Sequence, residues 1–151
     1  MVQRLVQVTL LAALMAGCAM APSTAPTPQA PMTVEQELAP GSPAMELYQH
    51  ARQARQQGNQ GAAGRYLERA LTMAPDSSWL YRELADLHLS QGDARGAEGF
   101  ALRALRLAPD NTAYRAGLWE MVATARARQG NQAGADNARA HAEQLREPST
   151  T

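Results

Sequence analysis

From about residue 43 onward, apolar side chains recur every three or four positions, and glycine or proline interrupts the pattern at regular points. Such spacing predicts amphipathic helices, because it places the apolar side chains on one face. Serine, asparagine or aspartate, which cap helix N-termini well, lies close before each apolar stretch. The predicted helices span about 43–57, 60–73, 78–91, 94–107, a fifth stretch capped by Asp110 or Asn111 that stops at Gly130, and 132–146. We therefore expect an all-α protein with three helix pairs.

The helix pairs repeat along the chain. Two Pro-Asp dipeptides, Pro75-Asp76 and Pro109-Asp110, lie 34 residues apart. A shift of the sequence by the same distance places small residues on small residues and turn glycines on turn glycines. The matched positions are Ala51 with Ala85, Gly58 with Gly92, Ala63 with Ala97 and Ala70 with Ala104. Helices approach closely where side chains are small, so these alanines mark the expected helix contacts.

This pattern resembles the tetratricopeptide repeat, a 34-residue helix-turn-helix unit. The resemblance implies a right-handed solenoid of helical hairpins, with repeats at about 44–77, 78–111 and 112–147 and a short tail at 148–151. The third pair departs from the period, because Trp119 falls where a small residue is needed. A shift of four residues places Ala123 there instead, so we expect the fifth helix to be one turn longer. Arg139, Glu143 and Gln144 give the sixth helix the polar face of a terminal cap.

The first 18 residues resemble a bacterial lipoprotein signal. Arg4 precedes an apolar run from Leu5 to Met15 that is too short to span a bilayer, and Ala16 and Gly17 then precede Cys18. Cys18 is the single cysteine of the chain, so it has no partner for an internal disulfide. The resemblance implies that residues 1–17 are a signal peptide and that Cys18 carries a covalent lipid. An ordinary secretory signal and an uncleaved anchor are the alternatives.

The lipoprotein resemblance also implies a location. Ala19 stands where an aspartate usually means retention in the inner membrane, so we expect the outer membrane, on the periplasmic side, with the inner membrane as the alternative. Residues 18–43 form the predicted tether, because six of the nine prolines lie within it and proline disfavours helix and sheet interiors. Residues 34–38 could form one helical turn, but so short a helix does not hold alone.

Charge and composition narrow the possible functions. Lysine and arginine together number 14, as do aspartate and glutamate, so the formal net charge is zero, and every basic residue is an arginine. A nucleic-acid-binding protein would show a basic stripe, so we expect no nucleic-acid partner. Hydrophobic residues make up 45% of the chain but aromatic residues only 5%, which suits thin layers of closely packed helices.

The family resemblance implies where a partner would bind. In such solenoids the first helix of each pair lines the concave face and contacts the partner. The chain offers there aromatic and arginine side chains, which are frequent in binding hot spots. We expect a groove for an acidic protein or peptide partner in the periplasm. Its predicted residues are Met45, Tyr48, Arg52, Arg55, Trp79, Arg82, Asp86, Leu89, Glu120 and Arg128. The alternative is that Trp79 is packed and the arginines are only solvated.

No catalytic constellation is evident. His50, His88 and His141 have no spacing typical of a metal site, and the helix glycines do not form a phosphate-binding loop. We therefore expect no enzyme activity, no metal and no cofactor apart from the lipid on Cys18. The favoured function is a membrane-anchored adaptor in a cell-envelope complex, such as a pilus or secretion pore or cell-wall machinery. The alternatives are a self-associating scaffold and a domain that binds cell-wall glycan.

Overall fold

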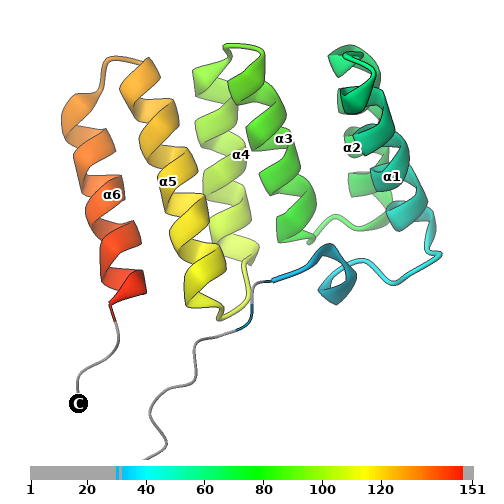
Figure 1. Ribbon diagram of the computed structural model, residues 1–151, viewed down its shortest axis with the longest axis horizontal. Coiled ribbons are helices and arrows are strands. Elements are labelled where there is room, and N and C mark those ends of the chain that lie inside the picture. Colours follow the sequence, from blue (N-terminus) through cyan, green and yellow to red (C-terminus); the bar gives the residue numbers. More distant parts are fainter. Residues whose placement is uncertain (1–29, 31, 148–151) are drawn as a thin grey trace, which may run out of the picture.

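The computed structural model describes residue 30 and residues 32–147, and every regular element in them is helical. The predicted signal peptide, Cys18 and the tail 148–151 lie outside the described residues. A single 3-10 turn at Val34–Gln36 precedes six α-helices. The helices are α1 (Pro43–Gln56), α2 (Gln60–Met73), α3 (Ser78–Ser90), α4 (Ala94–Leu107), α5 (Thr112–Arg128) and α6 (Gln132–Arg146) (Figure 1). The prediction of an all-α protein with three helix pairs is confirmed.

Each helix begins at a polar cap whose side chain accepts a hydrogen bond from a backbone N–H three residues later. The cap of α3 is Ser77, and that of α5, for which the sequence left two candidates, is Asn111. Within each pair the turn contains a glycine with positive φ, at 74° in Gly58, 82° in Gly92 and 79° in Gly130. Glycine adopts this backbone conformation without steric cost, so it ends the first helix of each pair.

The hairpins α1–α2, α3–α4 and α5–α6 follow one another across the molecule (Figure 1). The second helix of each hairpin packs on the first helix of the next, and α3 also contacts α5. The repeated alanines are buried, as their small size requires. Leu67, Leu84 and Leu118 fill the space between layers, each with at most 1% of its surface exposed. None of the described helices is long and apolar enough to cross a bilayer.

The third hairpin has the shifted register that the sequence predicts. Helix α5 has 17 residues, whereas α1 has 14. Ala123 takes the buried small position, and Trp119 stacks instead on His141 of α6 with ring centroids 4.6 Å apart. The extra turn of α5 therefore moves a bulky ring out of a contact that only a small residue can fill.

The folded body begins earlier than the predicted boundary at residue 44. Met32, Val34 and Leu38 are all buried, with at most 8% of their surface exposed. We refer to Met32–Leu38 as the N-terminal segment. The expectation that residues 18–43 form only a tether therefore needs correction, because apolar side chains near its end pack on the repeats. The 3-10 turn in this segment packs on the repeats, and so short a helix needs such tertiary support.

Candidate functional site: an inner groove and the segment that bounds it

A groove runs between α1 and α3, with a volume of about 530 Å³. Five of the ten predicted partner-binding residues line it, together with Gln56, Glu83 and part of the N-terminal segment. The five are Tyr48, Arg52, Arg55, Trp79 and Asp86. The structure thus brings half of the predicted site to one hollow, which the N-terminal segment bounds at one end.

An ion-pair network crosses the groove floor. Arg55 of α1 lies 3.1 Å from a carboxylate oxygen of Glu83 and also pairs with Asp86, both on α3. Arg82 lies 3.1 Å from the other oxygen of Glu83. The Glu83 side chain is only 13% exposed. Burial raises its pKa above the usual value, and the nearby Arg82 and Arg55 oppose that rise. The network therefore holds a largely desolvated carboxylate between two guanidinium groups.

Aromatic rings form the other wall of the groove. The ring of Tyr48 is buried, and the guanidinium carbon of Arg52 lies 5.9 Å from its centroid. Burial raises the pKa of Tyr48, so the phenol stays neutral. Trp79 stacks on Tyr114 of α5 and carries the guanidinium of Arg82 at 4.8 Å from its ring. Arg52 is exposed and makes no ion pair within the described part of the chain, so it offers a cation to a partner.

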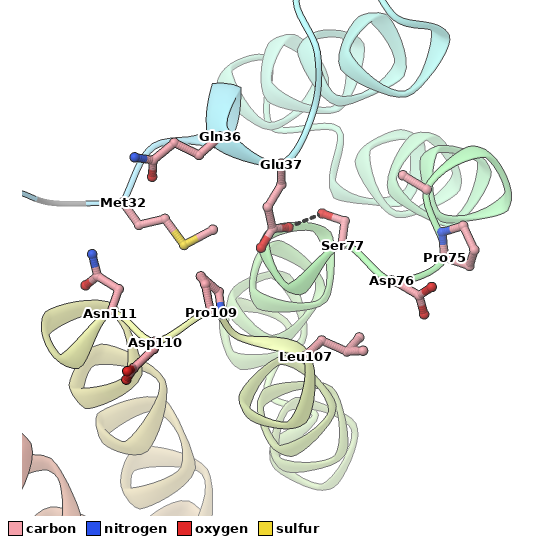
Figure 2. A pocket seen from close by; sticks show the side chains of 11 residues that line it. Met32, Gln36, Glu37, Pro75, Asp76, Ser77, Leu107, Pro109, Asp110 and Asn111 are labelled. Carbon is pink, nitrogen blue, oxygen red and sulfur yellow. Dashed lines mark hydrogen bonds between the residues drawn. The ribbon is translucent and has the colours of Figure 1, made fainter.

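The N-terminal segment is held at the beginning of α3. Glu37 accepts hydrogen bonds from the hydroxyl of Ser77 at 2.6 Å, from the hydroxyl of Ser78, and from the backbone N–H of Trp79 at 2.9 Å. Ser78 is fully buried and also lies 3.1 Å from the hydroxyl of Tyr114. A carboxylate at a helix N-terminus is favourable, because free N–H groups and the helix dipole converge there. Figure 2 shows Glu37 directed from the N-terminal segment at Ser77, with their hydrogen bond as a dashed line.

A second anchor lies one repeat further on. The side-chain amide of Asn111, the cap of α5, donates to the carbonyl oxygen of Ala30 at 3.0 Å. A hollow of about 670 Å³ separates the two anchors on the outer side of the segment, with Met32, Glu37, Pro75 and Pro109 among its lining residues (Figure 2). The segment therefore passes between this hollow and the inner groove, and Met32 lines both.

Comparison with known proteins agrees with the helical-repeat fold. The family model of the tetratricopeptide repeat matches residues 54–118. The globular C-terminal domain of P. aeruginosa LpoP is 40% identical in sequence and has a similar structure, with a TM-score of 0.64. The match covers 68% of this chain and 96% of that domain. The chain belongs to the tetratricopeptide repeat family. A search of curated proteins finds no significant match.

The other predicted positions of this tetratricopeptide repeat protein lie outside the hollow or serve internal contacts. Met45 is 4% exposed and packs in the core beneath α1. Arg128 donates to the carbonyl oxygen of Leu89 at 2.5 Å and so ties α5 to α3. Glu120 pairs with Arg146 of α6 at 2.9 Å. Repeat position alone identifies the helix face, but it does not say which side chains the protein uses for its own packing.

Two parts of the repeat domain's site were missed from the sequence. Glu83 does not occupy one of the family's partner positions, although it forms the centre of the ion-pair network. Its signal is the acidic pair Glu83 and Asp86 on α3, spaced like the basic pair Arg52 and Arg55 on α1. The N-terminal segment was missed because its anchors lie more than one repeat away in sequence. Its one available signal is the alternation of Met32, Val34 and Leu38 with polar residues.

Proposed function

We propose that this protein is a lipid-anchored adaptor that binds a protein partner in the periplasm through the inner groove. It acts by binding and not by catalysis, and it serves assembly or maintenance of a cell-envelope complex. The lipid is carried by Cys18, which attaches the repeat domain to the outer membrane. The observation that carries the proposal is the groove itself, where an exposed cation and buried aromatic rings meet in one hollow.

The chemistry of the groove favours an acidic partner. Arg52 is available for a carboxylate, whereas Arg55 and Arg82 are already paired with Glu83. Arginine binds carboxylates in a planar, bidentate geometry and stacks on aromatic rings. One residue type therefore both binds the partner's carboxylate and orients it. Trp79 is half-buried and presents a flat, rigid surface that loses little conformational freedom on binding, whereas the buried ring of Tyr48 lies beneath Arg52.

The likeness to the LpoP domain supports a shared binding surface. The two are similar over nearly the whole of that domain, and both repeat domains follow an N-terminal region in their chains. We propose that they bind the same class of partner. Among envelope complexes, pilus or secretion pores and cell-wall machinery are the candidates that the adaptor would serve.

Self-association as a scaffold is the less favoured function. End-to-end stacking of solenoids buries apolar end faces, and stable interfaces need well over 1,000 Å² of buried surface. Within the described residues, Met73 is the sole large hydrophobic side chain that is exposed, at 60%. The outer face of α6 carries polar residues such as Glu143 and Gln144, as expected of a terminal cap.

The test is photo-crosslinking in the native envelope. A photoreactive amino acid replaces Gln56, which is exposed and lines the groove beside Arg52, and a control variant replaces Arg95, an exposed arginine on α4. We expect an adduct with a distinct protein from position 56 alone. Excess soluble LpoP domain should reduce that adduct if the two share a partner. Equal adducts from both positions, or adducts that join two copies of this chain and no other protein, would refute groove binding, the second in favour of the scaffold.

A further inference from the structure

We propose that the N-terminal segment, together with Ala30, is an internal ligand of the repeat domain, and that an acidic segment of the partner displaces it. This inference rests on the proposed function, since it says what the partner's binding segment looks like. The docking site is the beginning of α3 and α5, beside the inner groove. Four observations carry it: the chemistry of the helix caps, the side chains that flank Glu37, the charge of the segment, and the hollows on both sides of it.

The helix caps have two separate roles. The hydroxyl oxygen of Ser77 accepts from the backbone N–H of Leu80 at 3.2 Å, and its proton goes to Glu37. The oxygen of Asn111 accepts from the N–H of Tyr114 at 2.9 Å, and its amide group donates to Ala30. Each cap therefore keeps its own helix capped when the segment leaves. Ser77 and Asn111 lie 34 residues apart, so successive repeats offer a donor at the same position.

The segment defines the pattern that this site recognises. Glu37 supplies the carboxylate at the start of α3. Val34, three residues before it, and Leu38, directly after it, pack into the core cluster shared by α1, α2 and α3. Met32 packs into the neighbouring cluster around α4 and α5. A competing segment thus needs an aliphatic residue, two further residues, a glutamate and another aliphatic residue, in that order.

The charge of the segment matches that of the groove. Residues 32–42 contain Glu35 and Glu37 and no basic residue. Glu35 lines the same hollow as Arg52 and Arg55. An acidic partner that satisfies the α3 cap would continue towards the unpaired Arg52, and electrostatic attraction would speed its arrival.

The hollows on both sides of the N-terminal segment leave room for a partner segment to replace it. The hollow outside the segment measures about 670 Å³, and the inner groove beside it about 530 Å³. Well-packed protein interiors contain few voids larger than a water molecule. The segment is therefore closely packed at its buried side chains and open on either side, which allows a partner to enter before the segment has fully left.

The test uses a labelled synthetic peptide of residues 30–42 and the full mature chain. In a chain variant that carries E37A and L38D, the chain's own segment no longer fits. We expect the peptide to bind this variant at least tenfold more tightly than it binds the wild-type chain. The E37Q peptide should bind at least tenfold more weakly than the unmodified peptide, because it loses charged hydrogen bonds to α3. The E35Q peptide has the same net charge and should lose less than threefold.

Absence of peptide binding to a natively folded variant would overturn the proposal. If the variant does not fold, hydrogen exchange of the wild-type chain decides. The amide of Leu38, which donates to Val34 at 2.8 Å, should exchange at least tenfold faster than that of Leu84 in α3. Equal rates would make the segment a permanent part of the fold and overturn the proposal. A doubled mass with exchanged segments would assign the site to a second copy of the chain.

The two proposals fail independently. An adduct from position 56 without peptide exchange would retain the adaptor and refute the internal ligand. Peptide exchange without an adduct in the envelope would do the reverse, because the exchange is measured on the purified chain.

Discussion

The indole ring of Trp79 on α3 stacks on the phenol ring of Tyr114 on α5, with centroids 5.9 Å apart and planes inclined by only 5°. These residues belong to successive repeats, so the stack links two hairpins that are otherwise joined mainly through α4. The side chain that the sequence marks as a partner contact is therefore also a structural connection. This double role has a measurable consequence for stability.

Replacement of Trp79 by alanine should lower the free energy of unfolding by about 2–4 kcal/mol, because it removes a half-buried ring from two core clusters. Urea denaturation followed by circular dichroism measures the change. The control is Met73→Ala at an exposed position, which we expect to cost less than about 0.5 kcal/mol. A loss below about 1 kcal/mol for Trp79→Ala would show that the ring is free for a partner.

Replacement of Arg55 by glutamine should destabilise the protein by about 1–2 kcal/mol at pH 7, since it leaves the buried carboxylate of Glu83 with Arg82 as its remaining partner. Burial already raises the pKa of Glu83 above 4.5. Protonation of Glu83 stabilises the folded state below pH 4.5. This stabilisation is lost as pH rises through the pKa that Glu83 has in the folded state.

The loss in Arg55→Gln should therefore be smaller at pH 4 than at pH 7 when urea unfolding is compared at both. Arg139→Gln is the matched control, because Arg139 pairs with Asp136 on the exposed face of one helix. An effect of Arg55→Gln that is equal at both pH values would contradict the assignment to Glu83.

Two glycines of α4 should respond in opposite ways to alanine. A methyl group at Gly99 would meet no atom within 4 Å, so Gly99→Ala should stabilise the protein by about 0.5–1 kcal/mol through helix propensity. A methyl group at Gly96 would lie 2.3 Å from Asp93 and 2.6 Å from His88. Gly96→Ala should therefore displace this pair and lower the melting temperature. Similar melting temperatures for both variants would contradict the prediction.

The protein should lose stability in alkali through Tyr114. Burial raises the pKa of Tyr114 from 10.0 to about 12. Neutral Tyr114 contributes about 2–3 kcal/mol to the free energy of unfolding. This contribution is complete below pH 10 and is lost as pH rises through about 12. Burial also raises the pKa of Tyr48, so comparison with Tyr114→Phe isolates the part of the loss that belongs to Tyr114.

Chemical unfolding between pH 9 and pH 12, with tyrosinate absorbance at 295 nm as the second signal, measures the effect. Tyr114→Phe should be less stable at pH 8, because it leaves Ser78 without this hydroxyl, and its stability should change less with pH. A wild-type chain whose Tyr114 ionises at about pH 10 without loss of structure would refute the buried position.

The helices could be predicted from the sequence because their ends depend on nearby residues. Asn59 and Gly58 begin and end helices through contacts within three to five positions, so the local pattern determines them. The longer α5 was predictable for the same reason, since Trp119 and Ala123 cannot exchange places in a close helix contact.

The boundary of the fold could not be predicted in this way. Glu37 lies 42 residues before Trp79, whose backbone N–H it accepts, and nothing near Glu37 indicates that partner. Met45 and Tyr48 were placed on the correct helix, but their burial depends on how α1 meets its neighbours. Contacts between distant segments decide which side chains of a predicted face remain open to solvent.

The hydrogen bond of Ala30 at the beginning of α5 also limits the distance between Cys18 and the repeat domain. If Cys18 carries the proposed lipid, about 12 residues connect the membrane to this anchor and extend at most roughly 40 Å. Release of the segment as far as the start of α1 would lengthen this connection to about 24 residues, or roughly 85 Å. The volume that the domain can search would then grow about eightfold, and its effective concentration near any one membrane site would fall accordingly. If both proposals hold, the segment that occupies the docking site also determines how far from the membrane the protein can find a partner.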